Sequence, residues 1–304
     1  MKKFIAVILC VAAVFSFAGC VEKSERDETK VQIVTTIFPL YDFARQVGGD
    51  KVQLTLILPT GAEAHSYEPT PKDVIEIKES DLFIAQGGDA DPWTGAVIND
   101  ADSKKVNVLY ALDSVALMSE EHEHSSDASH VHIDPHVWTT PNNAALISEN
   151  ICKKLCDIDA DNTDYYKENL AVYKEKLNSL DEKFAALTKD VDKTIIFADQ
   201  FPFRYFAKEY NLKYLAAFPG CSAESEPTAS AVAQIIDTVK EEKIPVVFYT
   251  ETSNKQLANA VCEETGAKKL LFHSCHSVTD DELKGGVTYL DLMEKNYEAL
   301  KKAI

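Results

Sequence analysis

Short apolar segments alternate with stretches of helical periodicity along most of the chain. In the first half, four short segments rich in β-branched and aliphatic residues are predicted to be strands: 31–37, 52–58, 82–85 and 106–109. Between them, three segments have the spacing and start signals of helices: 40–47, 71–79 and the stretch that begins near Pro92. Because parallel strands need a crossover between them, this order predicts βαβ units and a parallel sheet.

The second half of the chain repeats this pattern. Four further strands are predicted, again with helical stretches between them: 194–198, 214–217, 246–249 and 269–272. The pattern therefore predicts an α/β fold with two lobes, each of which is a mostly parallel sheet flanked by helices.

The strongest periodic signal lies between the two halves. Seven apolar residues recur at alternating spacings of four and three: Tyr166, Leu170, Tyr173, Leu177, Leu180, Phe184 and Leu187. This spacing places them on one face of a single helix about 40 Å long, with Asp161 or Thr163 as its N-cap. A coiled-coil arm is the alternative, but α/β segments on both sides favour one long rigid helix that joins the lobes.

The N-terminus has the pattern of an export signal. Lys2 and Lys3 precede an apolar run over residues 4–18, which is shorter than a membrane span of about 20 apolar residues. The run leads into the sequence AGC ending at Cys20, which resembles the bacterial lipobox, although Phe17 replaces the usual Leu. The resemblance implies lipidation of Cys20 and an extracytoplasmic protein anchored to the cell membrane. An ordinary cleaved signal or a membrane anchor is the alternative.

These patterns divide the chain into consecutive parts. They are a signal peptide (1–19), a polar lipidated tether (20–30), an N-terminal lobe (31–157), the linking helix (158–190) and a C-terminal lobe (191–304). Within the N-terminal lobe, residues 119–132 have no apolar period and are expected to form a mobile loop. The formal charge is −18, or −20 without Lys2 and Lys3, which argues against a nucleic-acid partner.

Cysteine is sparse for an exported protein. Five cysteines follow Cys20, an odd number, so no complete disulfide framework is expected. Cys152 and Cys156 lie four residues apart on one face of a helical segment, and we expect them to be buried apolar residues rather than a metal pair. Cys221 and Cys275 each follow a predicted strand, and a disulfide between them is compatible with that placement.

Histidines occur in segments suited to metal chemistry. Residues 119–132 hold four of the eight and are expected to recruit metal: His122, His124, His130 and His132. His65 lies in the segment GAEAHSYEPTP, directly after a predicted strand, and His136 lies in DPHVW. Ligands bind beyond the carboxyl ends of parallel strands, and neutral imidazole is a good ligand for zinc and its neighbours in the periodic table.

Taken together, these features resemble the zinc/manganese group of ABC-transporter solute-binding proteins. The resemblance covers nearly the whole mature chain: the lipobox, AHSYEPTP, the histidine-rich loop, DPHVW, the linking helix and the closing Tyr289, Met293 and Asn296. It implies two α/β lobes joined by one rigid helix, with a metal ion held at their interface and delivered to an ABC permease. His65 and His136 match the two N-lobe ligands of the family.

The C-terminal lobe departs from the family pattern. The resemblance places the two remaining ligands at Gln200 and Ser274, and both are poor metal ligands. The segment around Ser274 offers His273, Cys275 and His276, so we expect ligation to move onto it. His276 is the first choice, because an extended backbone would point it to the same side as Ser274, whereas His273 and Cys275 would need a turn. Four carboxylates are lower-ranked alternatives: Asp199, Glu224, Glu226 and Glu251.

Nitrogen ligation by His273 and His276 favours zinc, since manganese prefers oxygen ligands. We therefore expect a monomeric zinc receptor, with manganese as the alternative ion, and binding that weakens below about pH 6 as histidines protonate. A zinc hydrolase is disfavoured because the sequence has neither HExxH nor GxSxG. A metal-binding surface adhesin without its own transporter is a further alternative.

Overall fold

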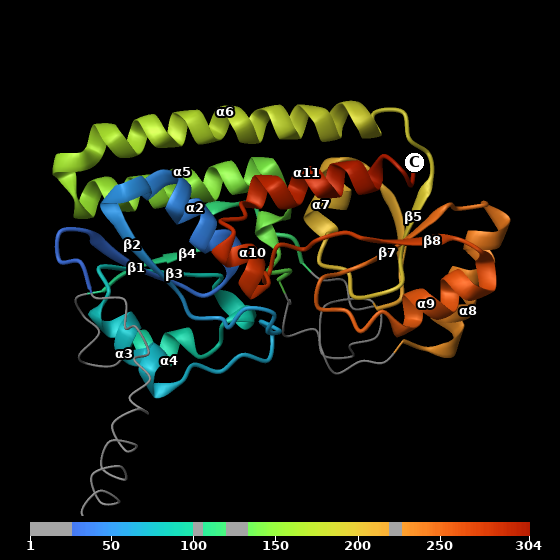
Figure 1. The fold of residues 1–304 in the computed structure, drawn as a ribbon, viewed down its shortest axis with the longest axis horizontal. Coiled ribbons are helices and arrows are strands. Elements are labelled where there is room, and N and C mark those ends of the chain that lie inside the picture. The colour runs from blue at the N-terminus through green and yellow to red at the C-terminus, as the bar shows by residue number, and fades with distance from the viewer. Residues whose placement is uncertain (1–25, 100–105, 120–132, 219–226) are drawn as a thin grey trace, which may run out of the picture.

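The computed structural model describes residues 26–99, 106–119, 133–218 and 227–304, which form two four-stranded sheets (Figure 1). In the N-terminal sheet the strands lie in the order β2 (Val52–Leu56), β1 (Val31–Thr35), β3 (Leu82–Ala85) and β4 (Asn107–Tyr110). In the C-terminal sheet the strands lie in the order β6 (Lys213–Ala216), β5 (Thr194–Phe197), β7 (Val246–Tyr249) and β8 (Lys268–Leu271). The paired strands of both sheets are parallel, which confirms the predicted fold class.

Helices cover both faces of the N-terminal sheet (Figure 1). One face carries α2 (Phe38–Gly48) and α5 (Pro141–Ile158), and the other carries α3 (Pro71–Glu79) and α4 (Thr94–Ile98). Ile33 and Val34 are neighbours in β1 but enter different apolar clusters, because successive strand side chains point to opposite faces. α2 begins two residues earlier than predicted, with Pro39 in its first turn, where the missing N–H is not needed.

The C-terminal sheet is covered in the same way. α8 (Ala229–Glu241) and α9 (Gln256–Thr265) bury one face in a cluster with β5 and β7. α7 (Arg204–Glu209) lies on the other side, in a group of aromatic rings that share the larger core: Phe197, Phe203, Phe206, Phe248 and Phe272. These rings fix the start of the loops that follow β5 and β8.

The linking helix is α6, over Thr163–Thr188, and Figure 1 shows it running along both lobes. The predicted stripe is confirmed, because five of its seven members are buried: Tyr166, Tyr173, Leu177, Leu180 and Phe184. The other two, Leu170 and Leu187, are partly buried and pack against the same core. Burial of one continuous stripe is what keeps a long helix straight against two lobes.

The start of α6 differs from the prediction. Asn162 is the N-cap, and its side chain makes no hydrogen bond to the helix. The prediction of Asp161 or Thr163 as the cap was wrong because a 3-10 turn over Ala160–Asn162 runs directly into α6. The side chain of Asn162 instead bonds to Asp159 at 2.8 Å.

The last two helices return towards the N-terminal lobe. They are α10 (Asp280–Lys284) and α11 (Tyr289–Leu300), and α11 packs against both α6 and α2. The fully buried carboxylate of Asp42 in α2 accepts a hydrogen bond from the Tyr289 N–H at 2.6 Å. Arg45, which also bonds to Asp42, donates to the Val287 carbonyl. The C-terminal segment is therefore built onto the N-terminal lobe.

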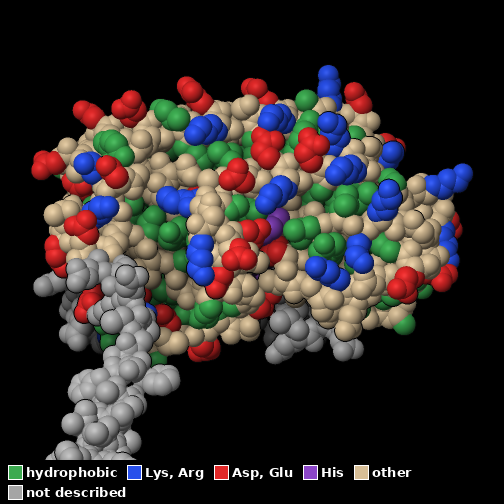
Figure 2. Space-filling view, in the orientation of Figure 1, with side chains coloured by type: hydrophobic (Ala, Val, Ile, Leu, Met, Phe, Trp, Pro, Cys, Tyr) green, Lys and Arg blue, Asp and Glu red, His purple; other side chains and the backbone are tan. Residues whose placement is uncertain are grey.

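Several sequence predictions fall outside the described residues: the signal peptide, Cys20, Cys221 and residues 120–132 of the histidine-rich loop. Cys152 is buried in the core and Cys156 packs against its edge, as expected of apolar residues. No helix in the described part of the chain is both long and apolar enough to cross a bilayer. Acidic and basic side chains are interspersed over the face shown in Figure 2.

Candidate metal centre

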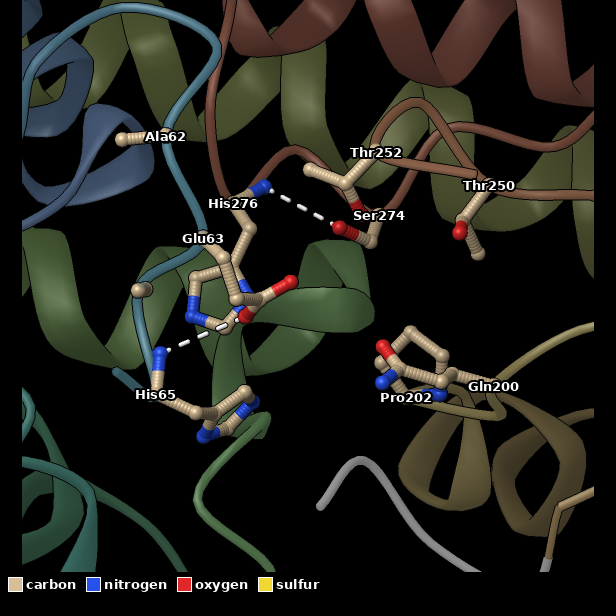
Figure 3. Close-up of a pocket in the computed structure, with 10 residues that line it drawn as sticks. Ala62, Glu63, His65, Gln200, Pro202, Thr250, Thr252, Ser274 and His276 are labelled. Carbon is tan, nitrogen blue, oxygen red and sulfur yellow. Dashed lines mark hydrogen bonds between the residues drawn. The ribbon is translucent and has the colours of Figure 1, made fainter. Parts of the chain in front are cut away.

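Loops that follow strands of both sheets meet in one pocket between the lobes (Figure 3). Its lining comes from the loops after β2, β5, β7 and β8: Ala62, Glu63, Ala64, His65, Gln200, Pro202, Thr250, Thr252, Ser274 and His276. Parallel sheets collect loop residues at the carboxyl ends of their strands, which is where ligands bind in such folds. Both lobes therefore contribute to the pocket.

His65 lies on the loop between β2 and α3. Gly61 lies in the first part of this loop with φ +71°, a conformation that glycine adopts without strain, and its N–H bonds to the Val278 carbonyl at 3.0 Å. At the other end of the loop, Thr70 and Asp73 form a capping box at the start of α3. The loop is fixed at both ends, so His65 is presented to the pocket by a defined backbone.

His136 is oriented by a buried carboxylate. Asp134 Oδ1 accepts hydrogen bonds from the His136 backbone N–H at 2.9 Å and from its ring Nδ1 at 2.7 Å. Since a carboxylate accepts, the Nδ1 proton is placed there and the Nε2 lone pair is left for a ligand. Burial is the largest single influence and would raise the pKa of Asp134, but the charge and hydrogen bonds of His136, together with the charge of Arg204, lower that pKa below its usual value.

His276 reaches the pocket from the C-terminal half of the chain. Its backbone N–H bonds to Ser274 Oγ at 3.2 Å, and its carbonyl accepts a bond from the Phe38 N–H at 3.3 Å. Cys275 has φ +65°, in the left-handed region, so the segment turns here instead of being extended as predicted. The His276 ring lies against Trp138, with ring centroids 4.8 Å apart.

The three imidazoles converge. The ligand nitrogens of His65, His136 and His276 all lie within 4.8 Å of one another, and the Nε2 atoms of His65 and His136 are 3.2 Å apart. Zinc–nitrogen bonds of about 2.0–2.1 Å in tetrahedral geometry place the nitrogens about 3.3 Å apart. Among the described residues, His276 Nε2 is buried without a hydrogen-bond partner, a costly state unless a ligand satisfies it.

The environment keeps these rings neutral. Burial, followed by repulsion from His136, lowers the pKa of His65 to about 4. Burial and the two neighbouring histidines lower the pKa of His276 well below its ordinary value. Both rings therefore present lone pairs at neutral pH, which is the form that binds metal.

His273 does not join the cluster. Its ring Nδ1 accepts a hydrogen bond from the Cys275 N–H at 2.9 Å, and its backbone N–H and carbonyl both bond to the Asn296 side chain. These bonds commit the residue to the turn that positions His276. Cys275 is a free, fully buried thiol, and burial raises its pKa well above the ordinary value, which disfavours the thiolate that a metal would need.

The other predicted C-lobe positions are divided. Gln200 and Ser274 both line the pocket. Asp199 and Glu251 do not line it, and their carboxylates are bonded to neighbouring backbone and hydroxyl groups. The remaining two carboxylates lie outside the described residues: Glu224 and Glu226.

Two acidic residues of the site were missed at the level of sequence, and they share a signal. Asp134 and Glu63 each lie two residues before a histidine, and each carboxylate accepts a hydrogen bond from the backbone N–H of that histidine. Asp134 also bonds to the ring of His136, whereas Glu63 lines the pocket. An acidic residue at this spacing is a recognisable local motif.

Comparisons with known proteins point in one direction. A family model described as zinc-uptake complex component A, periplasmic, matches residues 33–303. Zinc-binding lipoprotein AdcA of Streptococcus pneumoniae (strain R6) is 32% identical over 308 residues, which cover 99% of this chain and 61% of that protein. The chain thus spans about three fifths of the length of AdcA.

Two further matches extend over nearly the full length of the related molecule. High-affinity zinc uptake system protein ZnuA of Bacillus subtilis (strain 168) is 30% identical over 315 residues, which cover 100% of this chain and 98% of that protein. The Zn(II)-bound ZnuA-like domain of S. pneumoniae AdcA has a TM-score of 0.76 and 32% identity, covering 90% of this chain and 98% of the domain. With two parallel-sheet lobes, one linking helix and a family match over most of its length, the chain belongs to the family of periplasmic zinc-uptake complex components A.

Proposed function

We propose that the protein is an extracytoplasmic receptor that captures a zinc ion between its lobes and delivers it to an ABC importer. The proposal is carried by the convergence of three imidazoles, His65, His136 and His276, in one pocket. Family membership supports it, because the relatives described above are named as zinc-binding or zinc-uptake proteins.

Zinc is preferred to manganese because the converging donors are nitrogen atoms. Imidazole suits zinc, whereas carboxylate, carbonyl and water oxygens suit manganese. His276 supplies nitrogen close to the position where the family resemblance expects an acidic ligand, Ser274. Manganese is the alternative ion, and direct competition between the two ions distinguishes them.

Capture consists of replacing waters on the ion with preformed imidazoles. Asp134 holds His136 in the tautomer whose Nε2 carries a lone pair, and the fully buried Trp138 closes the site beneath His136 and His276. Because His65 and His276 are neutral at pH 7, the ion displaces no proton from them. We infer transport rather than catalysis because the relatives described above are named as zinc-binding or zinc-uptake proteins.

The histidine-rich loop is joined directly to the site. Ser119 and Ile133 form an antiparallel bridge at its base, and the next residue, Asp134, bonds through its N–H to the Met118 carbonyl at 2.9 Å. Ions collected by the loop would therefore be released close to His136. We propose that the loop recruits zinc, that lipidated Cys20 anchors the protein to the membrane, and that a monomeric receptor docks on the permease.

The test is a zinc and manganese titration of the mature chain, from Cys20 onward, against a competing chelator at pH 7.5. We expect one zinc ion per chain, bound more tightly than manganese. His276→Ala should weaken zinc binding by at least about 10- to 100-fold, since even the loss of an outer hydrogen-bond partner has an effect of that size. Asp192→Asn, an exposed substitution in the C-terminal lobe, is the control, and its zinc affinity should stay close to that of the wild type.

Two results would contradict the proposal. If zinc binds no more tightly than manganese, the proposal that zinc is the preferred ion is wrong. An unchanged zinc affinity in a folded His276→Ala variant would remove His276 from the site, and thermal denaturation of each variant shows whether it is folded.

A further inference from the structure

Three imidazoles leave a zinc ion one ligand short. Zinc in structural and storage sites takes four ligands in tetrahedral geometry, and three neutral rings also leave its full double positive charge inside the protein. A carboxylate in the fourth position would complete the geometry and halve that charge. No described carboxylate belongs to the group of ligand atoms that lie within 4.8 Å of one another, so the fourth ligand has to be a nearby side chain that can turn towards the rings of His65, His136 and His276.

The lining of the pocket contains one carboxylate, that of Glu63. The other polar side chains of the lining are neutral amides and hydroxyls, apart from the histidines: Gln200, Thr250, Thr252 and Ser274. Figure 3 shows the Glu63 side chain extending from its loop into the pocket, on the side from which His276 enters.

Neighbouring carboxylates are already committed to other bonds. Asp199 accepts hydrogen bonds from the Thr250 N–H and hydroxyl at 2.8 and 2.9 Å. Glu251 accepts from the Ser274 N–H and hydroxyl at 2.8 and 2.6 Å. Moving either carboxylate to a metal would leave buried donors unpaired, which costs free energy.

Glu63 is in a different state. Its Oε1 accepts one long hydrogen bond, 3.3 Å from the His65 N–H, and Oε2 has no hydrogen-bond partner among the described residues. Asp134 makes the same bond to the His136 N–H at 2.9 Å but is fixed by a second bond to the ring. The carboxylate of Glu63 can therefore turn towards an ion without breaking any strong interaction.

We propose that Glu63 is the fourth zinc ligand, binding through a carboxylate oxygen opposite the three imidazoles. The inference rests on the proposed function of the three-histidine site and adds an oxygen donor and a negative charge to it. The zinc ion would then have three nitrogen ligands and one oxygen ligand. Glu63 and His65 come from the β2–α3 loop, His276 comes from the turn after β8, and His136 comes from the segment before α5.

Substitution of Glu63 by Gln tests the inference, with Glu68→Gln as the matched control. Glu68 is an exposed carboxylate on the same loop and does not line the pocket. Glu63→Gln should weaken zinc binding by about 10- to 100-fold or more, while Glu68→Gln should leave it unchanged. Cobalt(II) replaces zinc as a visible probe, and free imidazole should shift the cobalt spectrum of Glu63→Gln but not that of the wild type, because only the variant has an open position.

The outcomes separate the two proposals. Equal zinc affinities for Glu63→Gln and Glu68→Gln, or an imidazole response in the wild type, would overturn the role of Glu63 while leaving the three-histidine receptor intact. A wild-type protein that binds no zinc would instead overturn the proposed function itself.

Discussion

The carbonyl of His276 accepts a hydrogen bond from the N–H of Phe38, the first residue of α2, at 3.3 Å. This bond attaches a residue from the last tenth of the chain to the N-terminal lobe. The Gly61 N–H adds a second tie to the Val278 carbonyl, and the Trp138 Nε1–H adds a third to the Ser274 carbonyl. The three histidines are therefore all attached to the N-terminal lobe, and the loops of the C-terminal sheet supply the uncharged opposite wall of the pocket.

The pairing of Asp134 with His136 leads to the first prediction. Asp134→Asn removes the charge that orients the His136 ring, and we expect zinc affinity to fall by about 10- to 100-fold. Asp91→Asn is the control, because Asp91 is a buried N-lobe carboxylate bonded to Gln86 and Thr36 rather than to a histidine. Chelator competition should show a loss in Asp134→Asn alone, and equal losses would contradict an orienting role.

The low pKa of His65 sets the pH dependence of zinc binding. With a pKa of about 4, the ring stays neutral at pH 6, so zinc affinity should hold from pH 7.5 to about 5.5 and fall only in more acidic solution. The buried rings thus move the expected loss below the pH 6 that the ordinary pKa of histidine indicates. Titration at pH 7.5, 6.0 and 5.0 measures this, and a tenfold loss already at pH 6.0 would contradict it.

The same shift makes the metal-free protein less stable in acid. Below pH 6.5 His65 becomes protonated in the unfolded chain, whereas in the folded chain its lowered pKa keeps it neutral down to about pH 4. The free energy of unfolding should therefore decrease between pH 6.5 and 4, by about 3 kcal/mol for this residue. Urea denaturation of the metal-free protein measures it, and His65→Gln should show a correspondingly weaker pH dependence.

Trp138 should report zinc binding by fluorescence. Its ring lies 4.8 Å from the His276 ring and 5.5 Å from the His136 ring, and the protein has one other tryptophan, Trp93. Zinc should change the emission of the wild type and of Trp93→Phe. The change should vanish in Trp138→Phe, and a signal that persisted there would place the ion elsewhere.

Asp42 should be a main support of the junction between α2 and α11. Its fully buried carboxylate pairs with Arg45 and accepts the Tyr289 N–H, so Asp42→Asn should lower the free energy of unfolding by about 3 kcal/mol. Asp192→Asn, which removes an exposed pair with Lys213, should cause no measurable change. Chemical denaturation compares the two, and equal effects would contradict the importance of the junction.

Much of the fold was predictable because its signals are local. The apolar stripe from Tyr166 to Leu187 and the alternation of strands with helices depend on short-range periodicity, and both are present in the structure. The N-cap of α6 was not predictable, since the turn before it depends on how α5 ends against α6.

The site divides in the same way. His65 and His136 stood out through their motifs, and the structure brings them together with His276. The segment around His276 was expected to be extended, yet the left-handed Cys275 turns it. That turn is fixed by contacts distant in sequence, such as those of His273 with Asn296, which no local pattern reveals.

For a receptor of the proposed kind, the long helix α6 would affect how a transporter distinguishes the zinc-bound form from the metal-free form. Tyr173 packs against Phe43 on one lobe, and Phe184 packs against Phe206 on the other, so the helix acts as a fixed spacer between them. A partner that senses the outline of the molecule would then meet nearly the same outline in both states. Recognition of the zinc-bound form would then depend on the surface around the mouth of the pocket. X-ray scattering profiles that match with and without zinc would support an unchanged outline.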